Sequence, residues 1–360
     1  MTASSRSSRG AVHGPAVVRD PKTSGVPPVP PEDSPTAGAS DEGRLRRRSG
    51  ERAGMNMDVK RVITDRIVAM LAQGEQVCRA RWVQAAVRGT PRNAATGQSY
   101  RGVNALLLWD AAIVQGYELS QWLTYRQAQA LGAQVRKGER GVLCAQFRRV
   151  SVGSGDGAAD TGPQDGFLRW RPFWLFNVAQ VDGLAAKRFD PLAAGAAGPS
   201  AEGHGAMEKA LRLVGGCHAA IRHGFDRAAY VPASDEIRLP LPTQFASCEN
   251  YAATLLHELV HWSGHPQRLH RAFGARYVDA AGAFEALVAE LGAVLLMGHC
   301  GLVGAVVEGH SDCLADWLAL LRHDRSAIFT AMRLAGEAFD FIVARQMPVL
   351  ASLARRDRLQ

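Results

Sequence analysis

Apolar positions recur at helical spacing in several segments of the chain, and a period of about 3.6 residues predicts amphipathic helices there. The first predicted helix begins near Asp58, closes at Gly74 and carries Val62, Ile63, Ile67, Met70 and Leu71. Further helices are predicted over 103–114, 122–131 and 204–223. The chain ends in helices whose apolar positions are Leu314, Trp317, Leu318, Leu321, Ile328, Met332 and Phe339.

Strands are predicted between these helices. A hairpin-like turn at 137–141 leads into a strand over 142–150, and its sheet partner is expected over 172–178, across a Gly- and Asp-rich loop. Residues 236–239 alternate polar and apolar side chains and are followed by prolines at 240 and 242. Proline lacks the amide that pairs with a neighbouring strand, so this segment is predicted to be an edge strand.

Composition divides the 360 residues into two expected domains with tails and a linker. The N-terminal segment, 1–56, is rich in Ser, Pro, Gly and charge and is expected to be disordered, with Met55 or Met57 as an alternative start. We predict an α+β fold class, with these parts: a small α+β domain over 57–185, a linker over 186–205, a mainly helical domain over 206–345 and a C-terminal tail over 346–360.

Cysteine usage and hydropathy indicate the cellular compartment in which the protein is expected. The six cysteines are scattered with no Cys-x-x-Cys pair, which argues against a disulfide framework and favours a reducing compartment. We find no apolar run near the roughly 18 residues of a membrane span, and the N-terminus has no hydrophobic signal core. A cytoplasmic protein with no membrane partner is therefore expected.

Basic residues concentrate in one part of the predicted fold. Residues 55–150 hold fourteen Lys/Arg and six Asp/Glu, a net charge of +8, whereas residues 151–360 hold nineteen and twenty-two, a net charge of −3. A basic module beside a slightly acidic one indicates a polyanionic partner, most simply nucleic acid. Ordinary solubilising charge is the alternative interpretation.

Aromatic residues lie among these basic residues, which favours a single-stranded partner. Aromatic faces stack on unpaired bases while Arg and Lys follow the phosphates. The candidate DNA-binding residues are Arg81, Trp82, Arg92, Tyr100, Arg101, Arg136 and Lys137. Of the aromatic residues, Trp82 and Tyr100 are expected to be exposed in polar loops, whereas Trp109 and Phe147 are expected in the core.

Residues 257–261 read His-Glu-Leu-Val-His, within a segment that keeps helical spacing up to Gly264. Positions i and i+4 share one helix face, so His257 and His261 can both reach a single Zn²⁺, with Mn²⁺ as the alternative metal. Glu258 is the expected catalytic base beside it. A structural helix that carries the motif by chance is the alternative. The predicted edge strand over 236–239 would let an extended substrate pair nearby.

A third metal ligand is expected from the next helix. Its apolar stripe comprises Phe284, Leu287, Val288, Leu291 and Leu295. Glu285 and Glu290 flank the stripe on opposite sides, so at most one is expected to face the metal. The segment resembles the ligand helix of Glu-zincins, which favours Glu285 and keeps Glu290 as the alternative. The metzincin pattern fails because Gln267 stands where its third His would be.

Together these motifs resemble the ArdC-type antirestriction proteins of plasmids and mobile elements, over roughly residues 57–345. The resemblance is carried by 91–93 with Gly97, 100–109, 122–125, 131–139, 176–178, 251–266 and 287–291. It implies an N-terminal domain that binds single-stranded DNA and a C-terminal zincin-like metallopeptidase domain, which together shield incoming DNA from restriction. One departure is Phe284-Glu285, where the family commonly has Glu-Glu.

Two functions follow from these expectations. In the first, the protein acts mainly as a DNA-binding antirestriction factor that carries a zinc peptidase site. In the second, it is a working metalloprotease that cleaves a host defence or DNA-bound protein, and the N-terminal domain is its targeting module. Glu258 favours a competent peptidase site, because a purely structural metal needs only its ligands.

Overall fold

The structure is a computed structural model that describes residues 58–151, 166–184, 203–271, 281–308 and 314–346. The expected N-terminal tail, nearly all of the C-terminal tail and most of the linker over 186–205 lie outside the described residues. All described residues belong to one compact contact unit, Met57–Gln360.

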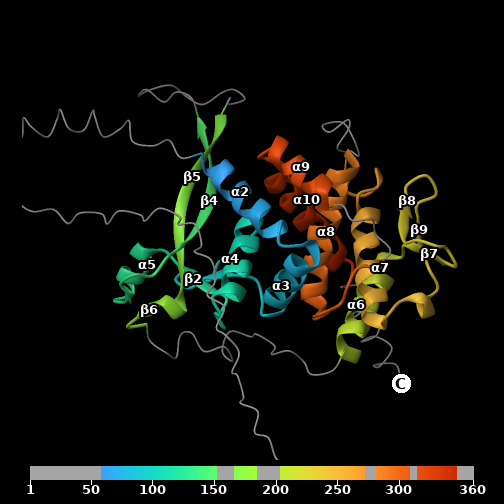
Figure 1. Ribbon diagram of the computed structural model, residues 1–360, viewed down its shortest axis with the longest axis horizontal. Coiled ribbons are helices and arrows are strands. Elements are labelled where there is room, and N and C mark those ends of the chain that lie inside the picture. The colour runs from blue at the N-terminus through green and yellow to red at the C-terminus, as the bar shows by residue number, and fades with distance from the viewer. Residues whose placement is uncertain (1–57, 152–165, 185–202, 272–280, 309–313, 347–360) are drawn as a thin grey trace, which may run out of the picture. The chain divides into compact units, whose positions relative to one another are not determined.

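Within the described residues, the first half contains four helices and a small mixed sheet (Figure 1). The helices are α2 (Val59–Leu71), α3 (Glu75–Val87), α4 (Val103–Val114) and α5 (Tyr125–Ala130). A four-stranded sheet has the order β1-β2-β5-β4, from β1 (Arg92–Asn93), β2 (Gln121–Leu123), β5 (Gly166–Asn177) and β4 (Val142–Ser151). A two-stranded sheet pairs β3 (Gln134–Val135) with β6 (Val181–Asp182), after a 3-10 turn over Val178–Gln180.

Most predicted elements of this half are confirmed. The side chain of Asp58 caps α2 by accepting a hydrogen bond from the Arg61 amide at 3.2 Å. The predicted sheet partners pair antiparallel, with Val142 opposite Leu175. The helix predicted over 122–131 is partly wrong, because its first residues form β2 and only Tyr125–Ala130 is helical. Thr124 separates the two elements and caps α5.

The second half is mainly helical. Its helices are α6 (Gly203–Cys217), α7 (Cys248–Ser263), α8 (Ala281–Cys300), α9 (Leu314–His323) and α10 (Ala327–Ala344), with a 3-10 turn over Pro242–Gln244. Its one described sheet contains β7 (Ala220–His223), β8 (Ala229–Val231) and β9 (Glu236–Leu239). The helix predicted over 204–223 therefore ends at Cys217, and its last residues are a strand.

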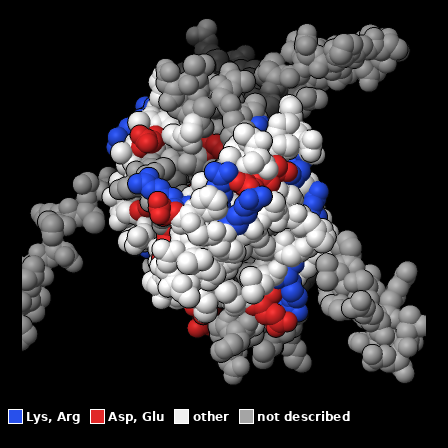
Figure 2. Space-filling model, turned by 90° about the vertical axis from the view of Figure 1, so that its right-hand side faces the viewer, with Lys and Arg blue, Asp and Glu red and all other residues white. Residues whose placement is uncertain are grey.

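The edge-strand prediction for residues 236–239 is wrong. β9 is the central strand, parallel to β7 on one side and antiparallel to β8 on the other. The prolines follow the strand and so remove none of its pairing hydrogen bonds. Figure 2 shows acidic and basic residues mixed over the face of the molecule that carries this sheet, where Arg222 and Arg238 both contact Glu236.

Helix α8 runs through the centre of the molecule and packs against α3, α7 and α10 (Figure 1). Two glycines allow its neighbours to approach closely. A Cβ atom at Gly292 would lie 2.8 Å from the Val260 methyl groups on α7, and one at Gly298 would overlap the Ala86 methyl group on α3. The close fit on both sides fixes α8 between α7 and α3.

Helix α8 differs from the expectation that no apolar stretch approaches the length of a membrane span. Its segment Gly282–Cys300 is the one described helical stretch that is long and apolar enough to span a membrane, with a mean hydropathy of 1.5. The two glutamates of the helix interrupt the apolar run but leave its average high. Because 78% of the segment is buried inside the protein, α8 is the central core helix here.

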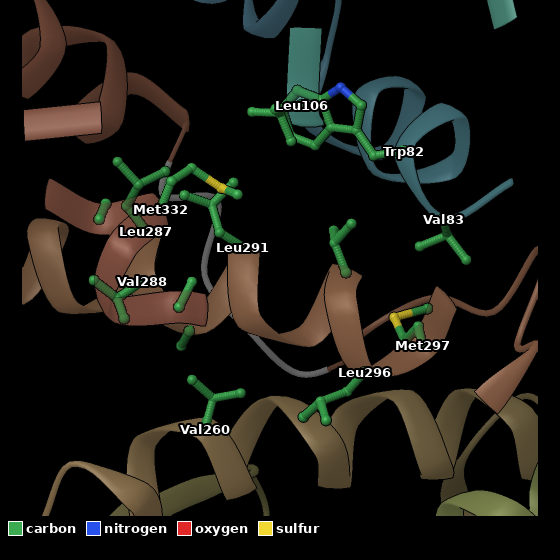
Figure 3. Close-up of a cluster of buried hydrophobic side chains, with 14 of the residues drawn as sticks. Trp82, Val83, Leu106, Val260, Leu287, Val288, Leu291, Leu296, Met297 and Met332 are labelled. Atoms are coloured by element: carbon green, nitrogen blue, oxygen red, sulfur yellow. The ribbon is translucent and has the colours of Figure 1, made fainter. Parts of the chain in front are cut away.

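The main hydrophobic core is continuous across both halves. Figure 3 shows Trp82, Val83 and Leu106 from α3 and α4 close to residues of α7, α8 and α10. The members labelled there from the second half are Val260, Leu287, Val288, Leu291, Leu296, Met297 and Met332. A smaller core lies around α5, β3 and β6. The shared core fixes the first half of the fold against the helix that carries Glu285 and Glu290.

Candidate metal centre

Helix α7 carries the His-Glu-Leu-Val-His motif in its last two turns. The Ser247 hydroxyl caps the helix by accepting a hydrogen bond from the Asn250 amide at 3.1 Å, and the helix ends before Gly264. His257 and His261 lie one turn apart, and their ring centroids are separated by 5.1 Å. His257 and Glu258 are buried, whereas His261 is partly exposed.

Two carboxylates of α8 lie against these histidines. Glu285 Oε1 is 3.3 Å from His261 Nδ1, and Glu290 Oε2 is 3.6 Å from His257 Nδ1. The sequence predicts that at most one of the two glutamates faces the metal, yet both lie against the histidines of α7. The helices run antiparallel at this point, so the one-turn spacing of the histidines matches the five-residue spacing of the glutamates and both carboxylates reach α7.

An arginine holds each of these carboxylates. Arg79 of α3 contacts both oxygens of Glu290, with Nη2 at 2.8 Å from Oε2. Arg271 lies 2.6 Å from Glu285 Oε1 through Nη2, and also donates to the Val260 carbonyl oxygen. No local pattern in the sequence assigns either arginine to the site, because Arg79 lies in the other half of the chain and Arg271 follows the motif at no characteristic spacing.

These contacts set the charge state of the carboxylates. Burial alone would raise the pKa of Glu290, but the charge and the hydrogen bonds of Arg79, together with the nearby His257, outweigh it and lower the pKa to about 2. Burial opposes ionisation of Glu285 as well, and hydrogen bonds from His261 and Arg271 bring its pKa below the usual value. Both glutamates are therefore carboxylates at neutral pH.

Glu258 faces the three-stranded sheet. Its Oε2 accepts a hydrogen bond from the backbone amide of Tyr230, on β8, at 2.6 Å. The Tyr230 hydroxyl donates to Asp235 at 2.9 Å, and Arg268 binds both oxygens of Asp235 at 2.5 and 2.9 Å. β8 is thus the edge strand next to the motif, in the position predicted for residues 236–239.

The donor set fits a divalent metal in its chemistry, although its side chains are directed elsewhere in this arrangement. Within the described residues, no group of three or more His, Cys, Asp or Glu side chains is placed to hold an ion. Arg271 and Arg79 take up the two carboxylates. A carboxylate beside Nδ1 favours the imidazole tautomer that leaves Nε2 as a metal ligand, and Glu290 has this place beside His257. To bind the ion itself, Glu285 would have to turn away from Nδ1 of His261 and from Arg271.

The predicted DNA-binding residues are dispersed, and one of them is wrong. Trp82 is 2% exposed and lies in the core (Figure 3), because its segment forms helix α3 and not a polar loop. Arg81 is half-buried, 4.0 Å from Asp110. Arg136 and Lys137 are exposed in the turn after β3, where Arg136 pairs with Glu139 at 2.7 Å. Trp109 is buried as predicted, and the Phe147 side chain lies outside the described residues.

Tyr100 and Arg101 border two cavities. The larger has a volume of about 1170 Å³, and residues from α4, β5, α6, α8 and α10 line it. Its aromatic and charged members are Arg88, Tyr100, Arg101, Trp109, Trp170, Lys209, His299, Phe329, Arg333, Glu337, Phe339 and Asp340. The smaller cavity, of about 430 Å³, also contains Asn93, Asn104 and Gln127. Arg101 lies 3.1 Å from Asp340. Arg92 is exposed on β1, next to Asn93.

Two family profiles match the two halves. Residues 57–166 match the N-terminal domain of anti-restriction factor ArdC, and residues 208–334 match a zincin-like metallopeptidase domain. The two-domain α+β architecture is confirmed by these matches and by the similarity to a solved structure. The metal motif and both glutamates fall within the second match, and Tyr100 and Arg101 within the first.

Relatives match most of the chain. The protein y4eC of Sinorhizobium fredii is 36% identical over 80% of this chain and 92% of its own length. A DNA primase TraC of Escherichia coli is 33% identical over 78% of this chain, but the match spans 27% of that protein.

Solved structures of the antirestriction ArdC protein from plasmid R388 match in a metal-free and an Mn(II)-bound form. Each is 32% identical with a TM-score of 0.63, and the matches cover 81% of this chain and 98% and 99% of the respective chains. Identity and coverage at this level are sufficient to show that this chain belongs to the ArdC family of antirestriction proteins.

Proposed function

We propose that this protein binds single-stranded DNA as an antirestriction factor of a mobile element and also carries a zinc-dependent peptidase site. The family supports the antirestriction role, because the R388 relative is named for it. The observation that carries the DNA-binding part is the pair of cavities that Tyr100 and Arg101 border. The protein would act in the cytoplasm, where incoming DNA meets restriction enzymes.

The cavities suit unpaired nucleotides. The larger one combines aromatic rings, among them Trp170 and Phe339, with the cations Arg88, Arg101, Lys209 and Arg333. Aromatic rings stack on bases, and cations pair with phosphates. Bases held in a duplex are stacked and paired, so they do not enter a recess of this kind. The side-chain amides in the smaller cavity offer hydrogen bonds to base edges.

A binding experiment with the full chain tests this proposal. Fluorescence anisotropy with a labelled single-stranded oligonucleotide is expected to show weaker binding for Arg101→Ala and Arg333→Ala. In each variant, the slope of log affinity against log salt concentration should fall by about 1, which corresponds to the loss of one phosphate contact. Arg212→Ala is the matched control, because Arg212 is an exposed helical arginine that lines neither cavity. Wild-type affinity in both cavity variants, or equal affinity for a duplex of the same length, would reject the proposal.

For the metal, we propose His257, His261 and Glu285 as ligands, with Zn²⁺ as the metal and Mn²⁺ as the alternative. Glu285 is favoured over Glu290 because it belongs to the more exposed of the two His–Glu pairs: His261 is 19% exposed and His257 is 5% exposed. Glu290 is buried, and Arg79 donates hydrogen bonds to both of its carboxylate oxygens. Its role is then to fix the His257 imidazole from the Nδ1 side.

When bound, the metal supplies Lewis-acid activation of water and of a substrate carbonyl group. Glu258 would take the proton of the attacking water and return it to the leaving amine. The Tyr230 amide holds one oxygen of that carboxylate, and the clamp of Arg268 and Asp235 on the Tyr230 hydroxyl keeps β8 in place. A peptide substrate is expected to pair with β8 on the side away from β9.

The contact between the base and an edge strand favours a second candidate function. In this alternative the protein is an active metalloprotease that cleaves a host defence or DNA-bound protein, and the N-terminal half serves to target it. The two functions differ in whether DNA protection needs Glu258. Comparison of wild type with Glu258→Gln in a protection assay distinguishes them.

A further inference from the structure

The two halves of the molecule share a chain of buried polar contacts. Arg79 comes from α3, within the region that matches the ArdC N-terminal domain. It binds Glu290 on α8, and Glu290 lies 3.6 Å from Nδ1 of His257 on α7, both within the zincin-like region. The side chains of all three are at most 5% exposed.

The contact with Arg79 fixes the orientation of the Glu290 carboxylate as well as its ionised state. The guanidinium meets the carboxylate with Nε and Nη2, one nitrogen on each oxygen, so the carboxylate cannot rotate freely. Glu75, one turn earlier on α3, also contacts Nη2 of the same guanidinium. Burying an ion pair costs desolvation energy, and hydrophobic side chains of similar volume often stabilise a protein as well as a buried pair does.

The orientation of the carboxylate matters to the histidine beyond it. A carboxylate beside the Nδ1 atom of a metal-binding histidine sets the tautomer and the ring orientation, and loss of such a partner typically weakens metal binding by about 10–100-fold. Glu290 has this position on His257. The position depends in turn on Arg79, which is supplied by the other half of the chain.

We propose that Arg79 is a positioning residue of the metal centre. It acts through Glu290 to hold the His257 imidazole for the metal, so the N-terminal half completes a site whose ligands all lie in the C-terminal half. This inference rests on the proposed metal site at His257 and His261. It also couples the two halves, because a shift of α3 relative to α8 would release Glu290 and weaken the site.

The test measures Zn²⁺ affinity of the full chain by competition with a chelating dye. Arg79→Ala is expected to weaken Zn²⁺ binding by about 10–100-fold. Arg79→Lys is expected to weaken it less, because lysine keeps the charge but cannot make the bidentate contact with Glu290. Val83→Ala is the matched control. It removes buried packing from the same helix (Figure 3) and leaves Arg79, Glu290 and His257 unchanged. It should lower the unfolding temperature and keep the wild-type Zn²⁺ affinity.

A second variant covers the case in which Arg79→Ala does not fold. Arg79→Met combined with Glu290→Gln leaves no unpaired buried charge, and it is expected to fold and to bind Zn²⁺ more weakly than wild type. Wild-type affinity in every folded Arg79 variant would overturn the inference, and so would an equal loss in Val83→Ala. If wild type and His257→Ala bind Zn²⁺ equally, the proposed metal site itself fails.

Discussion

The Tyr230 amide and the Glu258 carboxylate are joined by a hydrogen bond of 2.6 Å. This contact places Glu258, which directly follows His257 in the motif, against the edge strand β8. A base that is held by a strand edge is close to the position where an extended peptide would add to the sheet. The same contact orients the carboxylate without involving either histidine, so the base and the ligands are separable by mutation.

Glu258→Gln is expected to keep the metal and the DNA affinity of wild type. Glutamine retains the size of the side chain and an oxygen to accept the Tyr230 hydrogen bond, but it cannot take a proton from water. Elemental analysis and anisotropy measure the two retained properties. Peptide-bond cleavage, followed with labelled casein, should fall by about 10²–10⁴-fold relative to wild type. Loss of the metal in this variant would contradict the separation of base and ligands.

Substitution of the two glutamates of α8 should give different losses. Glu285→Ala removes a proposed ligand and is expected to abolish metal retention after dialysis, as is His257→Ala. Glu290→Ala removes an orienting carboxylate and should weaken binding by about 10–100-fold. Elemental analysis and dye competition measure both effects. The opposite pattern, with loss only in Glu290→Ala, would make Glu290 the third ligand.

Asp340→Asn is expected to strengthen binding of single-stranded DNA. Asp340 holds Arg101 at 3.1 Å at the border of the larger cavity, and both side chains are more than half exposed. Release of an exposed ion pair makes the arginine available at a cost of under about 1 kcal/mol, so a gain of up to about fivefold is expected. Glu208→Gln breaks a similar pair, with Arg212, outside the cavity and should leave the affinity unchanged. Weaker binding by Asp340→Asn would show that Arg101 does not meet the DNA.

Gly292→Ala tests the packing that brings the glutamates to the histidines. The added methyl group would lie 2.8 Å from the Val260 methyl groups, and overpacking of this kind costs about 1–3 kcal/mol. Urea unfolding should therefore show lower stability, and Val260→Ala in the same chain should restore part of it. Gly215→Ala is the control, because a methyl group meets nothing there and alanine favours a helix. Equal stability of the Gly292 and Gly215 variants would contradict the packing described for α7 and α8.

Sequence alone was sufficient where the determinants are local. Helix α7 was predicted with its motif and its end, because the apolar spacing, the histidine spacing and Gly264 all lie within one segment. Helix α3 was missed because Arg79 interrupts its buried face, which also contains Cys78, Trp82 and Val83. The same omission led to the wrong expectation that Trp82 is exposed.

Other features depend on neighbours that are distant in the sequence. The alternation in β9 resembles that of an edge strand, and only the pairing with both β7 and β8 shows that it is central. The pairing of Glu290 with Arg79 and the cavity at Arg101 likewise join the first half to the last helices. No local pattern encodes these contacts, so the sequence indicated the ligand types but not the residues that hold them.

Protection of incoming DNA by binding of the strand can be measured by a protection assay in cells. Plasmid transfer into a restricting host would be compared for wild type, Glu258→Gln and Arg101→Ala at matched protein levels. We predict that Glu258→Gln protects as well as wild type and that Arg101→Ala protects less, because occupancy of the strand and not peptide cleavage blocks restriction. Loss of protection in Glu258→Gln with unchanged DNA binding would contradict this account and favour an active protease directed at a defence protein.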